Sequence, residues 1–390
     1  MTTKPSYTPA LRFPDFLNVG EWEVKRLGEI VTVNYGRDYK HLNPGNIPVY
    51  GTGGYMLSVD DKLSDTDAIG IGRKGTIDKP QYLKAPFWTV DTLFFLTTKN
   101  GYDIRFVYCL LQTIDWKKYS EQTGVPSLTR SSIEKIEVRI SPLAEQQRIA
   151  ACLSSMDELL SATNGKLEQL KAYKKGMMQK LFPAKGKKLP ELRFKEFEKD
   201  GEWEVKKLGE VTKDVNRRNK SNRNLPIYSI SNKDGFILQS EQFDGLDSVS
   251  RGYDTSLYKI VTSNTFAYNP ARINVGSIGY SGNIKECLIS SLYVCFKTTE
   301  DVDDSFLMYF FDTSSFNHSV ENNVEGGIRS YLFYENFSKI KIMFPSISEQ
   351  KRIVSFLKAI DEIIDALSNK FSELERYKIG MMQKMFPIIK

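Results

Sequence analysis

Histidine and paired cysteine are scarce in this chain. Among 390 residues there are two histidines, His41 and His318, and four cysteines without any Cys-x-x-Cys spacing. A catalytic zinc site or a Ser-His-Asp triad therefore has almost no residues from which to be built. Free thiols, rather than a disulfide framework, are expected at Cys109, Cys152, Cys287 and Cys295.

Long apolar runs are also missing. No stretch approaches the roughly 20 apolar residues that span a bilayer, and residues 1–6 contain no apolar segment of the secretory kind. We therefore expect a cytoplasmic protein without a membrane partner. The composition is otherwise that of an ordinary globular chain, with 41% hydrophobic residues, 26% charged residues and a net charge of +6. Such a charge is compatible with nucleic-acid binding but does not by itself predict it.

What the chain does contain is one set of motifs that occurs twice. The motifs stand in the same order in both halves, which indicates a tandem duplication. The pairs are LRF at 11–13 and 192–194, EWEVKRLGE at 21–29 and EWEVKKLGE at 202–210, EQQRI at 145–149 and EQKRI at 349–353, and YKKGMMQKLFP at 173–183 and YKIGMMQKMFP at 377–387.

The segments between these motifs differ. Residues 30–144 and 211–348 scarcely match, and the second segment is longer. A constant frame with two different inserts is the plan of a protein that presents two different readers in fixed relative positions. Short β-rich runs and short helices predict a mixed α/β structure for both inserts. The predicted strands are Ile47–Tyr50, Ala68–Ile71, Thr92–Leu96, Leu225–Tyr228 and Ser291–Phe296, and the predicted helices are Ile104–Gln112 and Ser305–Phe311.

Each Glu-Gln motif opens a long helical pattern. Apolar residues recur in alternating steps of four and three, a period of about 3.5 that is typical of a coiled coil. The first seam is Ile149, Leu153, Met156, Leu160, Leu167, Leu170, Met177 and Leu181, with Thr163 and Lys174 at the skipped places. The second is Ile353, Leu357, Ile360, Ile364, Leu367, Phe371, Leu374, Met381 and Met385, with Lys378 at the skipped place.

Each helix would have about 38 residues and a length of roughly 57 Å at 1.5 Å per residue. The symmetry of a duplicated chain favours an antiparallel pair of these helices. The alternative is two separate amphipathic helices, each packed on its own domain.

The expected fold is therefore α+β, with two mixed α/β domains joined by two long helices in an antiparallel coiled coil, in pseudo-twofold duplicated halves. The expected parts are the first domain at 1–143, the first spacer helix at 144–183, a basic linker at 184–191, the second domain at 192–347 and the second spacer helix at 348–387.

Three segments are similar to cofactor or catalytic motifs without meeting their requirements. Gly51–Gly54 follows an apolar run, but the residues after it do not begin a helix whose N-terminus would hold a phosphate. The segment 70–76 lacks the Walker spacing and is a turn that presents Arg73 and Lys74. Asn269–Arg272 departs at two positions from the Asn-Pro-Pro-aromatic motif of amino-group methyltransferases, so no catalysis is expected there.

Basic and hydrogen-bonding residues gather in loops of both inserts. Arg and Lys reach guanine O6 and N7, Asn pairs with adenine, and all of them hold phosphates. For a single residue the alternative is a solvated charged surface, but the group as a whole favours DNA binding. The candidate DNA-binding residues are Tyr50, Thr52, Arg73, Lys74, Thr76, Arg130, Ser131, Arg217, Arg218, Lys220, Tyr228, Ser231, Asn232, Lys233, Asn269, Arg272, Asn274, Ser277, Arg329, Ser330 and Tyr331.

With these motifs the chain resembles the DNA-specificity subunit of type I restriction–modification systems. The resemblance covers the whole chain and rests on the openings at Trp22 and Trp203, the Glu-Gln helix starts and the Gly-Met-Met-Gln-Lys helix ends. The Pro-Pro-Leu that this family has before Glu-Gln is here Ser141-Pro142-Leu143 and Pro345-Ser346-Ile347, which is a small departure.

The resemblance implies two target-recognition domains, each reading one half of a split double-stranded DNA sequence, with the paired helices as a spacer. It implies a host-defence complex in which this chain, not itself an enzyme, holds two adenine-methylating modification subunits and two restriction subunits. The assembled complex would be an adenine-N6 DNA methyltransferase and an ATP-dependent endonuclease. S-adenosylmethionine, ATP and Mg would belong to the partners, and no cofactor is expected on this chain. The alternative function is a stand-alone two-domain DNA-binding regulator.

Overall fold

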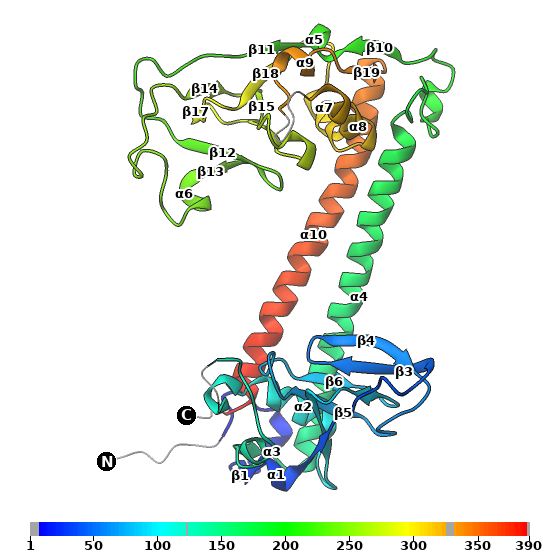
Figure 1. The fold of residues 1–390 in the computed structure, drawn as a ribbon, viewed down its shortest axis with the longest axis vertical. Helices are drawn as coiled ribbons and strands as arrows, with labels where there is room; N and C mark the ends of the chain where they lie inside the picture. Colours follow the sequence, from blue (N-terminus) through cyan, green and yellow to red (C-terminus); the bar gives the residue numbers. More distant parts are fainter. Residues whose placement is uncertain (1–7, 122–123, 325–330, 388–390) are drawn as a thin grey trace. The chain divides into compact units, whose positions relative to one another are not determined.

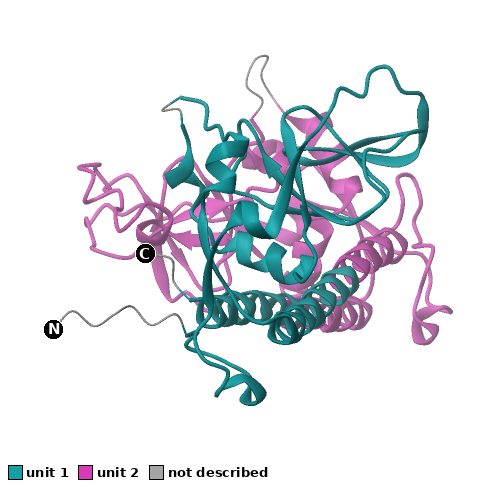
Figure 2. Ribbon diagram, turned by 90° about the horizontal axis from the view of Figure 1, so that it is seen from below, with its two compact units in different colours: residues 1–166, 367–390 teal, residues 167–366 magenta. Residues whose placement is uncertain are grey.

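The computed structural model describes residues 8–121, 124–324 and 331–387. The chain divides into two compact units: the first is formed by residues 1–166 and 367–390, and the second by residues 167–366 (Figure 2). Each unit thus contains one insert together with a part of each long helix.

The first unit is built on three small sheets (Figure 1). Its sheets have the strand orders β1-β9, β4-β3-β7 and β2-β8-β5-β6. The strands are β1 (Glu23–Arg26), β2 (Val31–Tyr35), β3 (Pro44–Gly51), β4 (Gly54–Val59), β5 (Ala68–Gly72), β6 (Gln81–Leu83), β7 (Trp88–Thr89), β8 (Leu93–Thr98) and β9 (Glu137–Ile140). The short helices are η1 (Pro14–Phe16), α1 (Leu27–Ile30), α2 (Ile104–Gln112), η2 (Trp116–Tyr119) and α3 (Arg130–Glu134).

The second unit follows the same plan. Its sheets have the strand orders β10-β19, β13-β12-β17-β14 and β11-β18-β15-β16. The strands are β10 (Glu204–Lys207), β11 (Thr212–Asp214), β12 (Ile227–Ser231), β13 (Gly235–Leu238), β14 (Lys259–Thr262), β15 (Phe266–Tyr268), β16 (Ile278–Tyr280), β17 (Glu286–Ile289), β18 (Val294–Thr298) and β19 (Lys341–Phe344). The short helices are η3 (Lys195–Phe197), α5 (Leu208–Val211), α6 (Gln239–Gln242), η4 (Ile273–Val275), α7 (Asp304–Phe311), α8 (Ser314–Asn323) and α9 (Tyr334–Phe337).

The two inserts therefore share one topology although their sequences scarcely match. In each insert a β-hairpin, β3–β4 or β12–β13, pairs in parallel with a later strand, β7 or β17. In each, the four-stranded sheet has the same order when strands are matched by their place in the chain. The described part of the first unit has no counterpart of β14, which lies in the longer second insert. The two inserts therefore differ in loops, in short helices such as α6 and α8 and in one added strand, but not in the topology that their sheets share.

Aromatic residues of the repeated motifs attach each insert to the end of a long helix. In the first unit, Trp22 lies 5.7 Å from Phe106 of α2, whose ring is 5.4 Å from Phe386 (centroid distances). In the second unit, Phe306 of α7 lies 6.1 Å from Trp203 and 5.2 Å from Phe182. Both tryptophans are buried, so the two cores are sealed by the same aromatic contacts.

The long helices are α4 (Leu143–Leu181) and α10 (Ile347–Met385), each of 39 residues. In the first unit the start of α4 packs with the end of α10, since Ile149 and Leu153 share a buried cluster with Met382 and Met385. In the second unit Leu181 shares a cluster with Ile353 and Leu357. The two helices are thus antiparallel within each unit, as the duplication predicts.

All seventeen seam positions selected from the seven-residue pattern are buried or half-buried, from Ile149 to Leu181 in α4 and from Ile353 to Met385 in α10. Local predictions for the inserts agree with the structure in part. The strands predicted at 47–50, 68–71 and 92–96 lie at β3, β5 and β8, whereas those predicted at 225–228 and 291–296 share only two and three residues with β12 and β18. The helix at Ile104–Gln112 has the predicted bounds, and α7 begins one residue earlier than predicted. Helix α8 and the second strands of the two hairpins were not predicted, because their short runs have no clear periodicity.

None of the helices in the described part of the chain has both the length and the apolar character of a membrane-crossing helix.

Candidate DNA interface

The repeated motifs build the frame and not the reading surface. In the first unit, Arg12 of the Leu-Arg-Phe motif donates to both carboxylate oxygens of Glu145, at 2.7 and 2.8 Å. In the second unit, Arg193 donates to both oxygens of Glu349, each at 2.8 Å. Both glutamates are buried, since Glu145 is 0% exposed and Glu349 is 1% exposed. A buried carboxylate requires such a partner, which explains why the two motifs are repeated together.

The glutamine of each Glu-Gln motif ties the long helix to a helix of the insert. In the first unit, Gln146 accepts from the backbone N–H of Asp103, the N-cap of α2, at 3.0 Å and donates to the Ser141 carbonyl at 2.7 Å. In the second unit, Gln350 accepts from Asp303 N–H, at the N-cap of α7, at 2.9 Å. The Glu-Gln pair thus joins the long helix to two distant segments at once.

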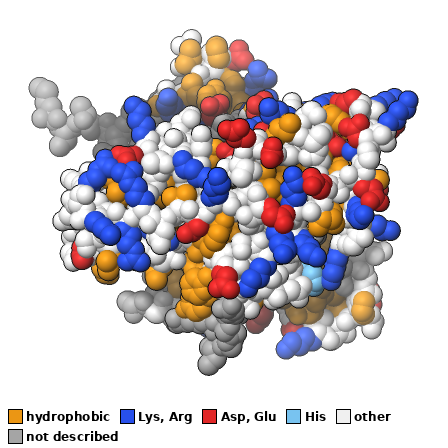
Figure 3. Space-filling view, turned by 90° about the horizontal axis from the view of Figure 1, so that it is seen from above, with side chains coloured by type: hydrophobic (Ala, Val, Ile, Leu, Met, Phe, Trp, Pro, Cys, Tyr) orange, Lys and Arg blue, Asp and Glu red, His pale blue; other side chains and the backbone are white. Residues whose placement is uncertain are grey.

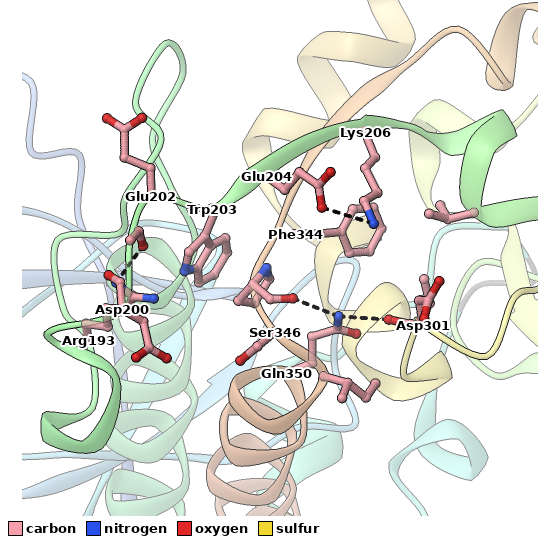
Figure 4. Close-up of a pocket in the computed structure, with 15 residues that line it drawn as sticks. Arg193, Asp200, Glu202, Trp203, Glu204, Lys206, Asp301, Phe344, Ser346 and Gln350 are labelled. Carbon is pink, nitrogen blue, oxygen red and sulfur yellow. Dashed lines mark hydrogen bonds and ion pairs between the residues drawn. The ribbon is translucent and has the colours of Figure 1, made fainter.

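A cleft of about 430 Å³ lies in the second unit where these frame contacts meet (Figure 4). Arg193, Trp203, Lys206, Asp301 and Gln350 are among the residues that line it. In the figure the side chain of Gln350, which is in the first turn of α10, extends toward the Asp301 segment and donates to the Asp301 carbonyl at 3.1 Å. Arg193 pairs with Glu349, Lys206 pairs with Glu204, and Gln350 donates to backbone carbonyls, so the cleft belongs to the frame rather than to the candidate DNA surface.

In the first unit the predicted turn at 70–76 contacts the segment at 126–128, which lies just before the predicted residues Arg130 and Ser131. The backbone carbonyl of Arg73 accepts a hydrogen bond from Leu128 N–H at 3.0 Å, and Gly75 N–H donates to the Pro126 carbonyl at 2.9 Å. Arg73 and Lys74 are exposed, and Thr76 is half-buried. The turn requires glycine at position 72, because a Cβ atom there would lie only 2.0 Å from the Thr76 carbonyl oxygen and would clash with it.

Tyr35 is a member of this surface that the sequence did not single out. It is 49% exposed, and the Arg73 guanidinium lies 6.0 Å from its ring centroid. Arg130 and Ser131, also predicted, are exposed in the first turn of α3. Arg130 donates to Glu134 at 2.7 Å, so its charge is partly engaged.

The hairpin β3–β4 forms a second part of the first candidate surface. A cleft of about 680 Å³ is lined by the segments 38–40, 51–56 and 90–92. Thr52 is half-buried in the hairpin turn, and its carbonyl accepts from Gln81 at 3.0 Å. Tyr50 is half-buried and packs on two apolar clusters, which makes it a supporting residue. Lys40 lines the same cleft and Gln81 bonds to the hairpin turn, but no periodic pattern or motif in the sequence marks either residue.

In the second unit three predicted segments are likewise brought together. Leu332 N–H donates to the Pro270 carbonyl at 3.0 Å, which matches the contact of Leu128 with Arg73 in the first unit. A Cβ atom on Gly276 would lie 3.6 Å from the Asn232 carbonyl oxygen, so the loop at 269–277 borders the hairpin turn. The same three places in one topology therefore form the candidate surface in both units.

Four predicted residues of this second surface are exposed, and one is buried. Asn232, Lys233, Arg272 and Asn274 are exposed. The prediction that Ser277 contacts DNA is wrong: Ser277 is 2% exposed and donates to the Ile230 carbonyl at 2.9 Å, so it holds the hairpin to the loop and does not face solvent.

The remaining predicted residues of the second surface are half-buried or not described. Asn269 is half-buried and accepts from Ala271 N–H at 3.0 Å. Ser231 shapes the hairpin turn by accepting from Lys233 N–H at 3.1 Å. The half-buried remainder is Tyr228, which packs beside Phe236, and Tyr331, whose ring stacks on Phe333. Arg329 and Ser330 lie outside the described residues.

The basic run at 217–220 lies elsewhere on the second unit. Ile260 N–H donates to the Arg217 carbonyl at 2.7 Å, which places the run along β14. Strand β14 is at the opposite edge of its sheet from β13, whose hairpin carries Asn232. Arg217, Arg218 and Lys220 are exposed, but Arg217 pairs with Glu286 at 3.4 Å. The structure therefore does not bring this run to the loops described above.

The longer second insert adds an aromatic and cationic cluster that the sequence analysis missed. The Arg251 guanidinium lies 4.6 Å from the Phe243 ring centroid and 5.4 Å from that of Tyr253. Tyr253 is 61% exposed. The greater length of the second insert was the available signal, but length alone does not indicate which residues an insertion presents.

The chemistry of the described residues is that of a binding surface. On the face drawn in Figure 3, Lys and Arg side chains are interspersed with Asp and Glu instead of forming one continuous basic area. Burial raises the pKa of the Cys109, Cys287 and Cys295 thiols to about 12, so these cysteines are neutral core residues. Among residues 8–121, 124–324 and 331–387, no group of His, Cys, Asp and Glu is arranged to hold a metal ion.

Two domains of one topology, each with variable loops at the same three places and both attached to one pair of helices, define a duplicated DNA-recognition protein. The chain belongs to the type I restriction modification DNA specificity domain family, whose model matches residues 20–172 and 200–376.

Known proteins agree with this assignment. The chain is 28% identical over 337 residues to the type I restriction enzyme MjaVIII specificity subunit of Methanocaldococcus jannaschii, covering 82% of this chain and 75% of that protein. Its fold is similar to the crystal structure of a type I restriction–modification S subunit from M. genitalium, with a TM-score of 0.65, 15% identity and coverage of 98% and 100% of the two chains. A solved chain from a study of complex assembly and conformational transition of the type I R-M system has a TM-score of 0.52 at 16% identity, with coverage of 94% and 97%.

Proposed function

We propose that this chain gives a type I restriction–modification complex its DNA specificity by reading two separated half-sites, one with each recognition domain. The observation that carries the proposal is the combination of a constant frame with loops that differ at the same three places in both domains. Each domain would contact a few base pairs, and the bases between the half-sites would be left unread. The paired helices would set how many bases are left unread.

The exposed residues of the two surfaces fit direct readout of base edges. Arg73 and Arg272 carry guanidinium groups that match guanine O6 and N7, and Asn232 and Asn274 carry amides that match adenine. Lys74 and Lys233 would hold phosphates and fix the position of each domain on the duplex. Residues that are half-buried, such as Tyr50 and Tyr228, would support these loops.

The partners of the chain follow from the same proposal. We infer that the chain binds double-stranded DNA and other subunits of the restriction–modification system. Specifically, we propose two modification subunits and two restriction subunits. The duplicated frame offers two equivalent surfaces, on the exposed helix faces and the strands β1 and β10, and two equal surfaces suit two copies of one partner. S-adenosylmethionine, ATP and Mg would be bound by these partners, in the cytoplasm.

The test is genome-wide mapping of adenine methylation in cells with and without this chain, with the cognate modification subunit present in both. A split methylated motif should be present with the chain and absent without it. An unchanged methylation pattern would contradict the proposal. The alternative, a stand-alone DNA-binding regulator, would be favoured if the chain purified without a methyltransferase under conditions that preserve its binding to DNA.

Replacing Arg272 by alanine is expected to weaken DNA binding by about 1–3 kcal/mol, roughly fivefold to 150-fold in Kd, if its guanidinium reads a base. The same magnitude is expected for Arg73→Ala. The measurement is the Kd of the complex for its own target and for targets changed at one base pair.

A matched control is Lys339→Ala, which removes one positive charge from an exposed residue that pairs with Glu335. A base-reading arginine should lose discrimination at one position, whereas a phosphate contact should weaken binding equally on all sequences. Unchanged affinity and an unchanged methylated motif would remove Arg272 from the reading surface.

A further inference from the structure

Two lysines interrupt the apolar seam of the long helices at equivalent places. Lys174 in α4 and Lys378 in α10 occupy the same position of the repeated motif, where the seven-residue pattern would place an apolar side chain. Their side chains are 21% and 14% exposed. A mostly buried ammonium is costly unless it is paired, so these positions need partners.

The partner of each lysine is an aspartate on the facing helix. In the first unit Lys378 pairs with Asp157 at 2.5 Å, and in the second unit Lys174 pairs with Asp361 at 2.6 Å. The aspartates also stand at equivalent places of the two repeats, each followed by glutamate. The duplication therefore preserves both members of a charge pair that crosses the seam.

This pair is satisfied in one alignment of the helices. A shift by one heptad would bring Lys378 opposite Ala150 or Asn164, and Lys174 opposite Val354 or Ser368, in place of the aspartates. Ala150 and Val354 are buried, at 3% and 6% exposed, so the displaced ammonium would meet apolar surroundings. By contrast, an apolar seam repeats every seven residues and tolerates such shifts more readily.

In the second unit the pair is also joined to the recognition domain. Tyr309 of α7 donates its hydroxyl to Asp361 at 2.7 Å, and the Lys174 ammonium lies 5.1 Å from the Tyr309 ring centroid. Helix α7 is held at its other end by Gln350. The position of the insert relative to α4 and α10 is thus tied to the same charges that align the helices.

We propose that the Lys378–Asp157 and Lys174–Asp361 pairs fix the register of the long helices and thereby the number of unread base pairs between the two half-sites. The inference rests on the proposed function. A polar pair inside an apolar seam contributes little net stability but excludes other alignments, and this is the established use of such residues in coiled coils.

The first experiment removes all four charges at once. The full chain with Lys174→Met, Asp361→Leu, Lys378→Met and Asp157→Leu is expressed with the modification subunit, and adenine methylation is mapped. The aspartate side chains are 47% and 33% exposed, and replacing both members of such a pair leaves no unpaired charge, so thermal melting should stay close to the parent temperature. Methylated sites with other gap lengths between the half-sites should then appear. If a second helix register is populated about one tenth as much as the first, at least about one methylated site in ten should have a new gap length.

The second experiment tests the pairing directly. Lys378→Asp and Asp157→Lys should each lower methylation at the native gap about tenfold or more, and the two together should recover it to within about twofold. The matched controls are Glu335→Lys and Lys339→Asp, which make the same kinds of charge change at an exposed ion pair outside the long helices and should leave the gap and its methylation unchanged.

The outcomes separate this proposal from the function on which it rests. Loss of all split-motif methylation in cells that lack the chain supports the function, and its persistence there overturns the function. If the four-residue variant folds and methylates the native gap alone, or if the double reversal is no better than the single reversals, register is set by other contacts and the present inference is wrong.

Discussion

Replacing Arg193 by methionine is expected to lower the free energy of unfolding by about 3–5 kcal/mol, the cost of leaving a buried charge without its partner. Glu349 is 1% exposed and accepts two hydrogen bonds from Arg193. The remaining donor near its Oε1 atom is Trp203 Nε1, at 3.3 Å, which supplies no charge. Thermal and urea unfolding of the full chain measure the loss, and Arg12→Met should act in the same way on Glu145.

Two variants make this result specific. The double replacement Arg193→Met with Glu349→Leu should recover most of the loss, because no charge is then left in the core. Arg352→Met breaks an exposed pair with Glu196, in which the side chains are 44% and 50% exposed, and should cost about 1 kcal/mol or less. A loss below roughly 1 kcal/mol in Arg193→Met would mean that water reaches Glu349 and that the buried pair is not what holds the motif.

The long helices were predictable because their signal is local and repeats many times. Each heptad places apolar residues on the same face of the helix, so the seam from Ile353 to Leu374 can be identified without knowing which helix packs against it. The Glu-Gln motif marks the start of a helix in the sequence, but its main contact is not local. Arg12 and Glu145 are 133 residues apart, and nothing in either motif indicates that they meet.

The inserts show where sequence reasoning ends. Their strands are short, and β3 pairs in parallel with β7 although three strands, β4 to β6, lie between them in the chain, so pairing depends on contacts that no local pattern encodes. For the same reason the candidate surface was predicted only in part. Arg73 and the segment at 126–128 do come together, whereas the exposed run at 217–220 lies along β14 and Ser277 turns into the domain.

Replacing residues 30–136 by residues 211–340 is expected to give a chain whose target contains the second half-site twice. The junctions lie beside equivalent backbone hydrogen bonds, from Leu27 N–H to the Ile136 carbonyl and from Leu208 N–H to the Ile340 carbonyl, both at 2.8 Å. Binding to the native target should fall by a factor of about 1,000 or more, because several base pairs are then mismatched at about 1–3 kcal/mol each. Methylation mapping with the modification subunit reads the new motif directly.

The frame should accept this exchange because the contacts that each insert makes with the helix ends are the same. Phe106 faces Phe386 in the first unit as Phe306 faces Phe182 in the second, so the transferred Phe306 would meet an equivalent ring. The reciprocal exchange, residues 211–340 replaced by 30–136, serves as the control and should duplicate the other half-site. If either chain binds the modification subunit but methylates the native motif, base recognition does not lie in the inserts. If both lose methylation while remaining folded and assembled, the half-site depends on residues of the frame that the exchange leaves unchanged.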